Sequence, residues 1–167
     1  MHSNVRYQDQ ALTPAVKFLE KQGVAHTVRR YELGDSHAGT YGEAVAKAIG
    51  AEPRRVFKTL IAQLNSSELV VAIVPVSSTL DLRALAAAAG TKSAVMAPPQ
   101  AAEKATGYVT GGISPFGQRK ALRTFVDCSL ETFPKVFVSA GRRGLQVEVD
   151  SSDLVRLCEA SVAELSE

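Results

Sequence analysis

The chain of 167 residues has few of the side chains from which disulfides, metal sites and common nucleophilic centres are built. Its two cysteines, Cys128 and Cys158, form neither a C-x-x-C pair nor a disulfide framework. The three histidines, His2, His26 and His37, have no ligand spacing with them, so we expect no metal and no organic cofactor. The G-x-S-x-G, H-E-x-x-H and P-loop patterns are also absent. A hydrolase of this sequence must therefore use backbone donors and its own substrate for much of the chemistry.

Long apolar runs and a strong net charge are missing as well. No stretch approaches the roughly 20 apolar residues of a membrane span, and the start, MHSNVRYQDQAL, lacks the layout of a signal peptide. We therefore expect a cytoplasmic protein without a membrane partner. The net charge of +2 does not by itself imply nucleic-acid binding. A local basic excess lies between residues 118 and 144, however, and it either meets phosphates or forms a solvated charged face.

Length and composition favour one globular domain. We expect a loose N-terminal extension over residues 1–12 and a single domain over residues 13–167. Capping and periodicity predict helices over 13–23, 40–50, 80–89, 98–104 and 153–165, and strands over 26–31, 56–64, 69–74, 93–96, 124–127, 136–139 and 145–149. Several neighbouring strands have connections too short for parallel crossovers. The pattern predicts an α+β fold with a mixed, mostly antiparallel sheet, curled or closed into a barrel, and helices outside it.

Residues 106–117, TGYVTGGISPFG, form a Gly-rich loop that contains four of the twelve glycines. Glycine reaches backbone conformations that other residues avoid, and it lets a ligand approach the main chain closely. The Gly111-Gly112 pair therefore has two interpretations. It is either a tight turn between two strands, or a place where N–H groups face an oxyanion or a phosphate.

Two further segments contain candidate polar groups. Lys58 and Thr59 interrupt the apolar stretch VFKTLIA, where a fully buried lysine would be costly. Lys58 either faces solvent from a half-exposed sheet or lines a cleft as a cation. The segment 138–145, VSAGRRGL, joins two expected strands through a turn with two arginines. These arginines suit a phosphate or lie in solvent on a long hairpin turn.

Three separated motifs in order, VFKTL at 56–60, TGYVTGGISPFG at 106–117 and VSAGRRGLQVEV at 138–149, resemble the YbaK/prolyl-tRNA-synthetase-associated editing domain family. The likeness runs from about residue 13 to the last helix and includes Asp127 and the sequence TLDL at 79–82. Within the family it is similar to the Cys-tRNA(Pro)/Cys-tRNA(Cys) deacylase branch. The resemblance implies a trans-acting enzyme that deacylates mischarged tRNA at its acceptor end, with a prolyl-tRNA synthetase complex as a partner.

The resemblance also implies a mechanism and a set of site residues. The thiol of the substrate attacks the ester carbonyl and forms a thiolactone, which accounts for the missing protein nucleophile. Backbone N–H groups at Gly111 and Gly112 face the carbonyl oxygen, and Lys58 anchors the terminal adenosine or its phosphate. Asp127 is either structural or in contact with substrate. The remaining pocket residues that it implies are Tyr31, Tyr41, Thr59, Ser139 and Gly141.

Two positions depart from the family pattern. Gln146 replaces an acidic residue, which alters substrate contacts or pocket charge, and Ala140 replaces a glycine in the turn. Two other functions stay open at this point. One is a deacylase for another amino acid, such as Ala-tRNA(Pro), and the other is a non-catalytic module that binds tRNA or a synthetase.

Overall fold

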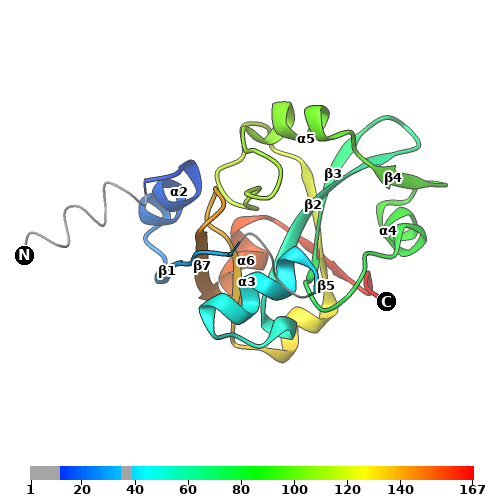
Figure 1. Ribbon diagram of the computed structural model, residues 1–167. Coiled ribbons are helices and arrows are strands. Elements are labelled where there is room, and N and C mark those ends of the chain that lie inside the picture. Colours follow the sequence, from blue (N-terminus) through cyan, green and yellow to red (C-terminus); the bar gives the residue numbers. More distant parts are fainter. Residues whose placement is uncertain (1–11, 35–38) are drawn as a thin grey trace, which may run out of the picture.

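The computed structural model describes residues 12–34 and 39–167, so the expected extension over residues 1–12 lies almost entirely outside the described part. Two sheets organise the chain (Figure 1). The three-stranded sheet has the order β1-β7-β6, with β1 His26–Arg30, β7 Leu145–Asp150 and β6 Lys135–Ser139. The five-stranded sheet has the order β4-β2-β3-β5-β8, with β4 Ala94–Met96, β2 Phe57–Leu64, β3 Leu69–Pro75, β5 Arg123–Asp127 and β8 Ser161–Ala163.

Antiparallel pairing dominates both sheets. The pairs β1–β7, β6–β7, β2–β3 and β2–β4 are antiparallel, whereas β3–β5 and β5–β8 are parallel. A parallel bridge between Val56 and Phe137 links the two sheets where β2 begins. Within the described residues the sheets do not close into a barrel. The predicted α+β fold with a mixed, mostly antiparallel sheet is therefore confirmed in its open form.

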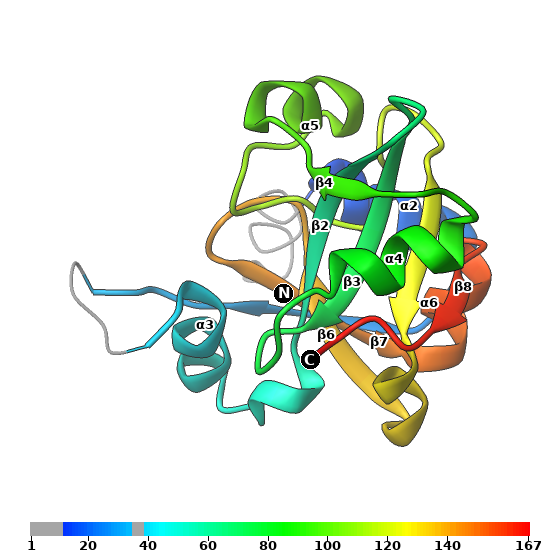
Figure 2. The same ribbon diagram turned by 90° about the vertical axis from the view of Figure 1, so that its right-hand side faces the viewer.

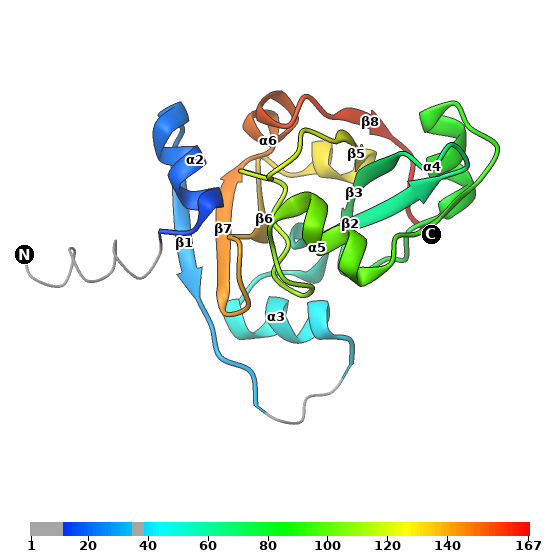
Figure 3. The same ribbon diagram turned by 90° about the horizontal axis from the view of Figure 1, so that it is seen from above.

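Five α-helices lie within the described residues: α2 Pro14–Gln22, α3 Tyr41–Ile49, α4 Leu82–Ala89, α5 Pro99–Thr106 and α6 Ser151–Leu157. Thr13 and Thr40 cap α2 and α3 as predicted, since each side chain accepts a hydrogen bond from a backbone N–H three residues on, at 3.2 Å. The carboxylate of Asp81 accepts from two N–H groups and sets a later start for α4 than the sequence predicted. Figure 3 shows α2, β1 and β7 at one end of the molecule and α4 at the other.

None of these helices combines the length and apolar character that a bilayer span needs.

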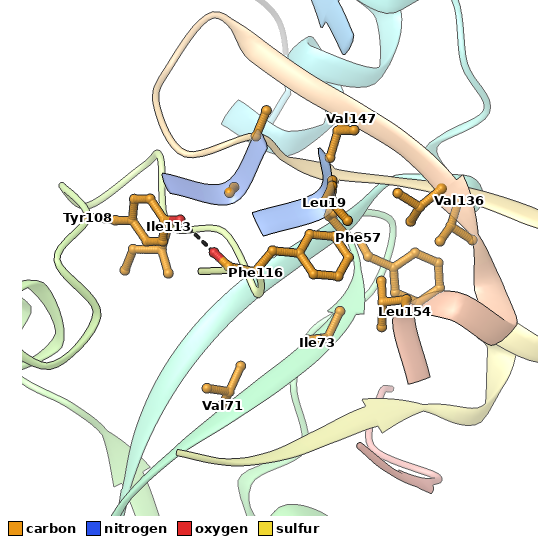
Figure 4. Close-up of a cluster of buried hydrophobic side chains, with 14 of the residues drawn as sticks. Leu19, Phe57, Val71, Ile73, Tyr108, Ile113, Phe116, Val136, Val147 and Leu154 are labelled. Atoms are coloured by element: carbon orange, nitrogen blue, oxygen red, sulfur yellow. Dashed lines mark hydrogen bonds between the residues drawn. The ribbon is translucent and has the colours of Figure 1, made fainter. Parts of the chain in front are cut away.

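The main hydrophobic core is built from both sheets, α2, α6 and the Gly-rich loop (Figure 4). Leu19, Phe57 and Leu154 are almost fully buried within it. The Gly-rich loop contributes two aromatic residues, Tyr108 and Phe116, and the Tyr108 hydroxyl donates a hydrogen bond to the Phe116 carbonyl at 2.5 Å. Both rings are buried. The loop is therefore fastened to the core on both sides of its glycine pair.

The end of the chain differs from the prediction. The helix expected over residues 153–165 ends at Leu157, and β8 follows it over Ser161–Ala163. The helix also begins earlier than predicted, at Ser151, with Asp150 in the N-cap position. Glu159 takes a φ of 48°, which a helix cannot continue through. The strand then pairs in parallel with β5, a long-range contact that local periodicity does not reveal.

Asp127 holds this C-terminal segment in place. Its carboxylate accepts hydrogen bonds from the N–H groups of Leu165 at 2.8 Å, Ser166 at 3.1 Å and Ser129 at 3.2 Å. Burial alone would raise the pKa of Asp127, but the hydrogen bonds from these three residues outweigh it and the pKa is lowered. Asp127 does not line the cleft described below. Its position supports the structural interpretation over substrate contact.

Replacing this carboxylate should destabilise the fold. We expect Asp127→Ala to lower the free energy of unfolding by about 2 to 3 kcal/mol, because buried N–H groups lose a charged acceptor. For a chain of this size, this loss of stability corresponds to a Tm that is lower by roughly 5 to 10 °C. Asp153→Ala, which removes the pair with Arg156 and a favourable charge in the first turn of α6, should lower the free energy of unfolding by only about 1 kcal/mol or less. Equal losses in both variants, measured by thermal unfolding, would contradict the assignment.

Candidate functional site

A cleft of about 610 Å³ opens beside the start of β2. Its walls come from the β2 segment 56–61, the start of α3, the end of β4 with α5, and the Gly-rich loop. Outside the β2 segment the lining residues are Thr40, Tyr41, Gly42, Val45, Val76, Met96, Ala97, Pro99, Ala102, Thr110, Gly111, Ile113, Ser139 and Gln146. Figure 2 shows α3 and α5 toward opposite ends of β2. Of the predicted site residues, the structure brings five together here: Tyr41, Lys58, Thr59, Gly111 and Ser139.

Lys58 is a cation available to a ligand. It is half-buried in β2, opposite Val74 of β3. Burial lowers the pKa of its ammonium group, and the nearby charge of Glu43 opposes that shift. Among the described residues no carboxylate lies within ion-pairing distance of Lys58. The cleft-lining interpretation of Lys58 is the one that its position supports.

The Gly-rich loop packs directly on the turn between β6 and β7. A Cβ atom at Gly112 would lie 2.7 Å from Arg142 Cα, and one at Gly111 would lie 2.4 Å from Arg143 Nε. Gly111 also has a φ of 91°, which side chains other than glycine rarely adopt. Gly112 is therefore required for the close approach, because its neighbour is backbone, whereas Gly111 is required by its φ.

The two glycines differ in what their N–H groups do. The N–H of Gly112 donates to the carbonyl of Val109 at 2.9 Å and so closes a turn within the loop. The N–H groups of Gly111 and Ile113 have no backbone acceptor within the described residues, and both residues line the cleft. The loop thus combines the two interpretations of the sequence, a tight turn and a set of available donors. Next to Gly111 it is therefore the N–H group of Ile113 that has no backbone acceptor, because the N–H group of Gly112 closes the turn.

Gly141 supports the turn from outside the cleft. Its φ is 110°, and a Cβ there would lie 2.9 Å from Tyr108 Cε1. Its N–H donates to Ser139 Oγ at 3.2 Å, which holds a cleft residue in place. The carbonyl of Ala140 accepts a hydrogen bond from the hydroxyl of Thr13. Ala140 is fully buried and its φ is not positive, so the turn accommodates alanine where the resemblance expects glycine.

Tyr31 and Tyr41 connect the cleft to a second, more open one of about 400 Å³. Their hydroxyl oxygens lie 3.2 Å apart. The guanidinium of Arg143 lies over the Tyr41 ring at 5.5 Å, and Gly144 and Leu33 lie beside them. Burial and then the hydrogen bond with Tyr31 raise the pKa of Tyr41, so its hydroxyl stays protonated at neutral pH. Tyr31 therefore belongs to the second cleft, while Tyr41 lines both.

Two acceptor oxygens in the first cleft have no hydrogen-bond partner in the structure. They are Thr59 Oγ1 and Gln146 Oε1. Both residues are buried, with 9% and 7% of their surface exposed. Buried polar atoms are normally paired, so these two are exceptions, and both are shielded from the open space of the cleft. Sequence reasoning connected Gln146 with substrate contacts or pocket charge as a departure from the family pattern, and the structure places it in the lining of the cleft.

Sequence reasoning also missed the apolar wall between β4 and α5. Met96, Ala97, Pro99 and Ala102 line the cleft there. The segment contains no polar motif, and it lies far from Lys58 in the sequence. The pairing of β4 with β2 brings the two together.

Comparison with known proteins identifies what the cleft resembles. The model of the family described as “Aminoacyl-tRNA editing domain” matches residues 35–157, a range that contains every residue lining the cleft. A protein of Enterococcus faecalis named “Putative Cys-tRNA(Pro)/Cys-tRNA(Cys) deacylase EbsC” is 34% identical over 157 residues, which are 94% of each chain. “Uncharacterized protein YwhH” of Bacillus subtilis is 26% identical over 112 residues, 67% of this chain and 71% of that one.

A solved structure is similar over nearly the whole fold. It is described as “a putative trans-editing enzyme for prolyl tRNA synthetase” and superposes with a TM-score of 0.77 at 25% sequence identity. The superposition covers 93% of this chain and 99% of that one. The resemblance predicted from the three motifs is confirmed.

The contact between the Gly-rich loop and the β6–β7 turn can be tested by adding single methyl groups. Gly112→Ala should displace the loop and lower the free energy of unfolding by about 1 to 3 kcal/mol, because backbone atoms of Arg142 occupy the space. Gly107→Ala is the control: its φ is 81° but its Cβ meets nothing closer than 3.6 Å, so it shows the cost of the backbone conformation alone, about 1 kcal/mol. Chemical-shift changes at residues 141–144 in Gly112→Ala, and none there in Gly107→Ala, are the expected NMR result.

Proposed function

Because the chain belongs to the family of aminoacyl-tRNA editing domains, we propose that it is an enzyme that deacylates mischarged tRNA, with Cys-tRNA(Pro) as its main substrate and Cys-tRNA(Cys) as a further one. The relative at 34% identity over almost the whole chain carries these two substrates in its name. The observation on which the mechanism depends is the composition of the cleft. Lys58, Gly111 and Ile113 line one space, and no cysteine or histidine is among its described lining residues.

A cleft of this composition suits a reaction in which the substrate supplies the nucleophile. The thiol sulfur of the cysteinyl group bonds to its own ester carbonyl carbon, and the bond from that carbon to the terminal ribose oxygen breaks. The thiol proton ends on the ribose oxygen, so the products are a cyclic thiolactone and free tRNA. The protein contributes orientation and stabilisation of the negative charge that develops on the carbonyl oxygen.

The donors in the cleft divide these tasks. We assign the N–H groups of Gly111 and Ile113 to the carbonyl oxygen, with Gly112 holding the loop that presents them. Lys58 binds the terminal adenosine or its phosphate, where an unpaired ammonium is a strong anion ligand. Tyr41 and Ser139 shape the pocket around the aminoacyl group.

The second cleft lies where the rest of an acceptor end would continue. An aromatic pair, Tyr31 and Tyr41, provides stacking surface for an unpaired base, and Arg143 provides a cation beside it. Arg142 precedes Arg143 in the turn, and Arg119 and Lys120 follow the Gly-rich loop in the sequence. We assign this surface to tRNA backbone in the cytoplasm, with a prolyl-tRNA synthetase complex as the partner that supplies tRNA specificity.

The proposed reaction predicts a substrate order and a dependence on Lys58. The protein should release cysteine from Cys-tRNA(Pro) well above the rate in buffer, and Ser-tRNA(Pro) should react more slowly because a hydroxyl is a poorer internal nucleophile. Lys58→Ala should lower kcat/KM for Cys-tRNA(Pro) by about 100-fold or more. Lys47→Ala is the matched control, since Lys47 is an exposed lysine near the end of α3.

Deacylation is measured with radiolabelled cysteine under single-turnover conditions. Release no faster than in buffer sinks the proposed function. Equal activity in Lys58→Ala and Lys47→Ala removes Lys58 from the site while leaving the function in place. Comparable rates on Cys-tRNA(Pro) and Ala-tRNA(Pro) exclude the substrate thiol as the required nucleophile.

The lowered pKa of Lys58 predicts a specific loss of binding at high pH. Because the protonated ammonium is the form that binds an anion, affinity should fall as the pH rises through that pKa, earlier than for an ordinary lysine at about 10.4. Binding of a CCA trinucleotide with a stable 3′-aminoacylamide measures this without cleavage. Lys58→Arg keeps its charge over this range and should remove the loss. An identical pH profile for wild type and Lys58→Arg is the contrary result.

A further inference from the structure

The tip of the Gly-rich loop, residues 109–111, is too exposed for packing in the core to fix its conformation. Tyr108 and Ile113 on either side of the tip are buried, whereas 66% of the surface of Val109 is exposed, and Thr110 and Gly111 are exposed as well. Thr110 and Gly111 nevertheless line the cleft. The hydrogen bonds that fix the backbone of the tip therefore also shape the cleft.

Residues 109–112 form a turn whose type decides the direction of one N–H group. The N–H of Gly112 donates to the carbonyl of Val109 at 2.9 Å, which closes a four-residue turn. Gly111, the third residue, has a φ of 91°, and the φ of Thr110 is not positive, so the turn is of type II. In a type I turn the central peptide is rotated by roughly 180°. The turn type therefore decides to which side the N–H of Gly111 points.

Glu103 of α5 holds the peptide that precedes this N–H group. Its carboxylate Oε2 accepts a hydrogen bond from the N–H of Thr110 at 2.8 Å. The carbonyl of the same peptide accepts from Gly112, so both polar groups of the peptide between Val109 and Thr110 are bound. The backbone carbonyl of Glu103 also accepts the N–H of Gly107, where α5 ends. Glu103 thus holds both the start of the loop and its tip.

The contact between Glu103 and Thr110 contributes orientation more than stability. It lies at the exposed surface, so water can replace either partner if the contact is lost. The hydrogen bonds from the N–H of Thr110 and then from its hydroxyl lower the pKa of Glu103, so the carboxylate is ionised at neutral pH. An ionised acceptor makes a shorter and stronger hydrogen bond than a neutral one. Among the described residues, no ion pair draws Glu103 away from the loop.

We infer that Glu103 is a positioning residue for the reaction, because its carboxylate fixes the type II turn that carries the N–H group of Gly111. This inference rests on the proposed function, which assigns that N–H group to the carbonyl oxygen of the aminoacyl ester. Glu103 is not among the residues that line the cleft, so it acts through Thr110 and Gly111. A donor that is fixed before the substrate binds needs no reorganisation when negative charge develops on the carbonyl oxygen.

Three variants separate the hydrogen bond of Glu103 from its charge. Glu103→Ala removes both, whereas Glu103→Gln keeps an acceptor oxygen without the charge. Glu20→Ala is the matched control, since it removes the charge of an exposed glutamate in α2. Single-turnover cleavage of Cys-tRNA(Pro) over a range of protein concentrations gives two values for each variant, the rate constant of cleavage and the half-saturating concentration.

Glu103→Ala should lower the rate constant of cleavage by about 10- to 100-fold, because a displaced donor stabilises the transition state less. The half-saturating concentration should change by about twofold or less, since the contact does not bind the ground state. Glu103→Gln should cleave within about threefold of wild type, because its amide oxygen accepts the same hydrogen bond. Glu20→Ala should match wild type in both values.

Amide NMR of the whole 15N-labelled protein tests the same contact without substrate. Glu103→Ala should shift the amide signals of Thr110 and Gly111 and make the Thr110 amide exchange faster with solvent. Glu103→Gln should keep the slower exchange of wild type. Glu20→Ala should leave both signals in place. Unchanged signals of Thr110 and Gly111 in Glu103→Ala overturn the inference.

The cleavage assay can also overturn the inference in three ways. Equal rate constants for Glu103→Ala and Glu20→Ala remove the role of Glu103, and so does a loss that lies only in the half-saturating concentration. Equal losses in Glu103→Ala and Glu103→Gln mean that the charge matters and the hydrogen bond does not. A Tm of Glu103→Ala as low as that of Asp127→Ala means that the carboxylate supports the whole fold, which also overturns the positioning role.

These outcomes are distinct from a failure of the proposed function. Cleavage by wild type that does not depend on Glu103 leaves the function in place and removes the positioning role. Shifted amide signals in Glu103→Ala, together with no cleavage by wild type, remove the function. The contact between Glu103 and Thr110 is then structural only, and its catalytic role is removed as well.

Discussion

The structure depends on the close contact between the Gly-rich loop and the turn that joins β6 and β7. Gly112 has no room for a Cβ beside the backbone of Arg142, and Gly111 adopts a left-handed φ beside Arg143. Tyr108 and Phe116 hold the loop in the core on both sides of this contact. With both ends buried and the centre packed on the turn, the loop forms one wall of the cleft, where Gly111 and Ile113 have N–H groups without a backbone acceptor among the described residues.

The chemistry of the cleft depends on the elements that lie opposite the Gly-rich loop. The bridge between Val56 and Phe137 brings the start of β2 to the small sheet, so Lys58 and Thr59 share a space with residues of β6 and β7. One ammonium is left without an ion-pair partner there and two oxygens without donors, within the described residues. Unsatisfied groups of both kinds in one cleft are costly in the free protein.

Local sequence signals predicted most elements correctly where the interactions that end them are also local. Thr13 and Thr40 begin helices through hydrogen bonds three residues away, and Gly23 and Gly50 end them in the left-handed conformation. The predicted end of the last helix was wrong because the interactions that replace the helix are distant in the sequence. Asp127 accepts hydrogen bonds from the N–H groups of residues 165 and 166, which lie 38 and 39 positions away. The sequence predicted Gly112 and Gly141 as site residues. In the structure both pack beside the cleft and do not line it.

The sequence by itself determined the α+β class, the three motifs and the family, and it singled out Lys58 and Gly111, because each is a local pattern of residue types at short spacing. Only the tertiary structure decided that Gln146 and Thr59 line the same cleft, and that the N–H group of Gly112 closes a turn while that of Ile113 has no backbone acceptor among the described residues. The physical reason is that hydrogen-bond satisfaction is a property of all neighbours in space. No residue type or spacing reveals whether a donor or acceptor has already been used.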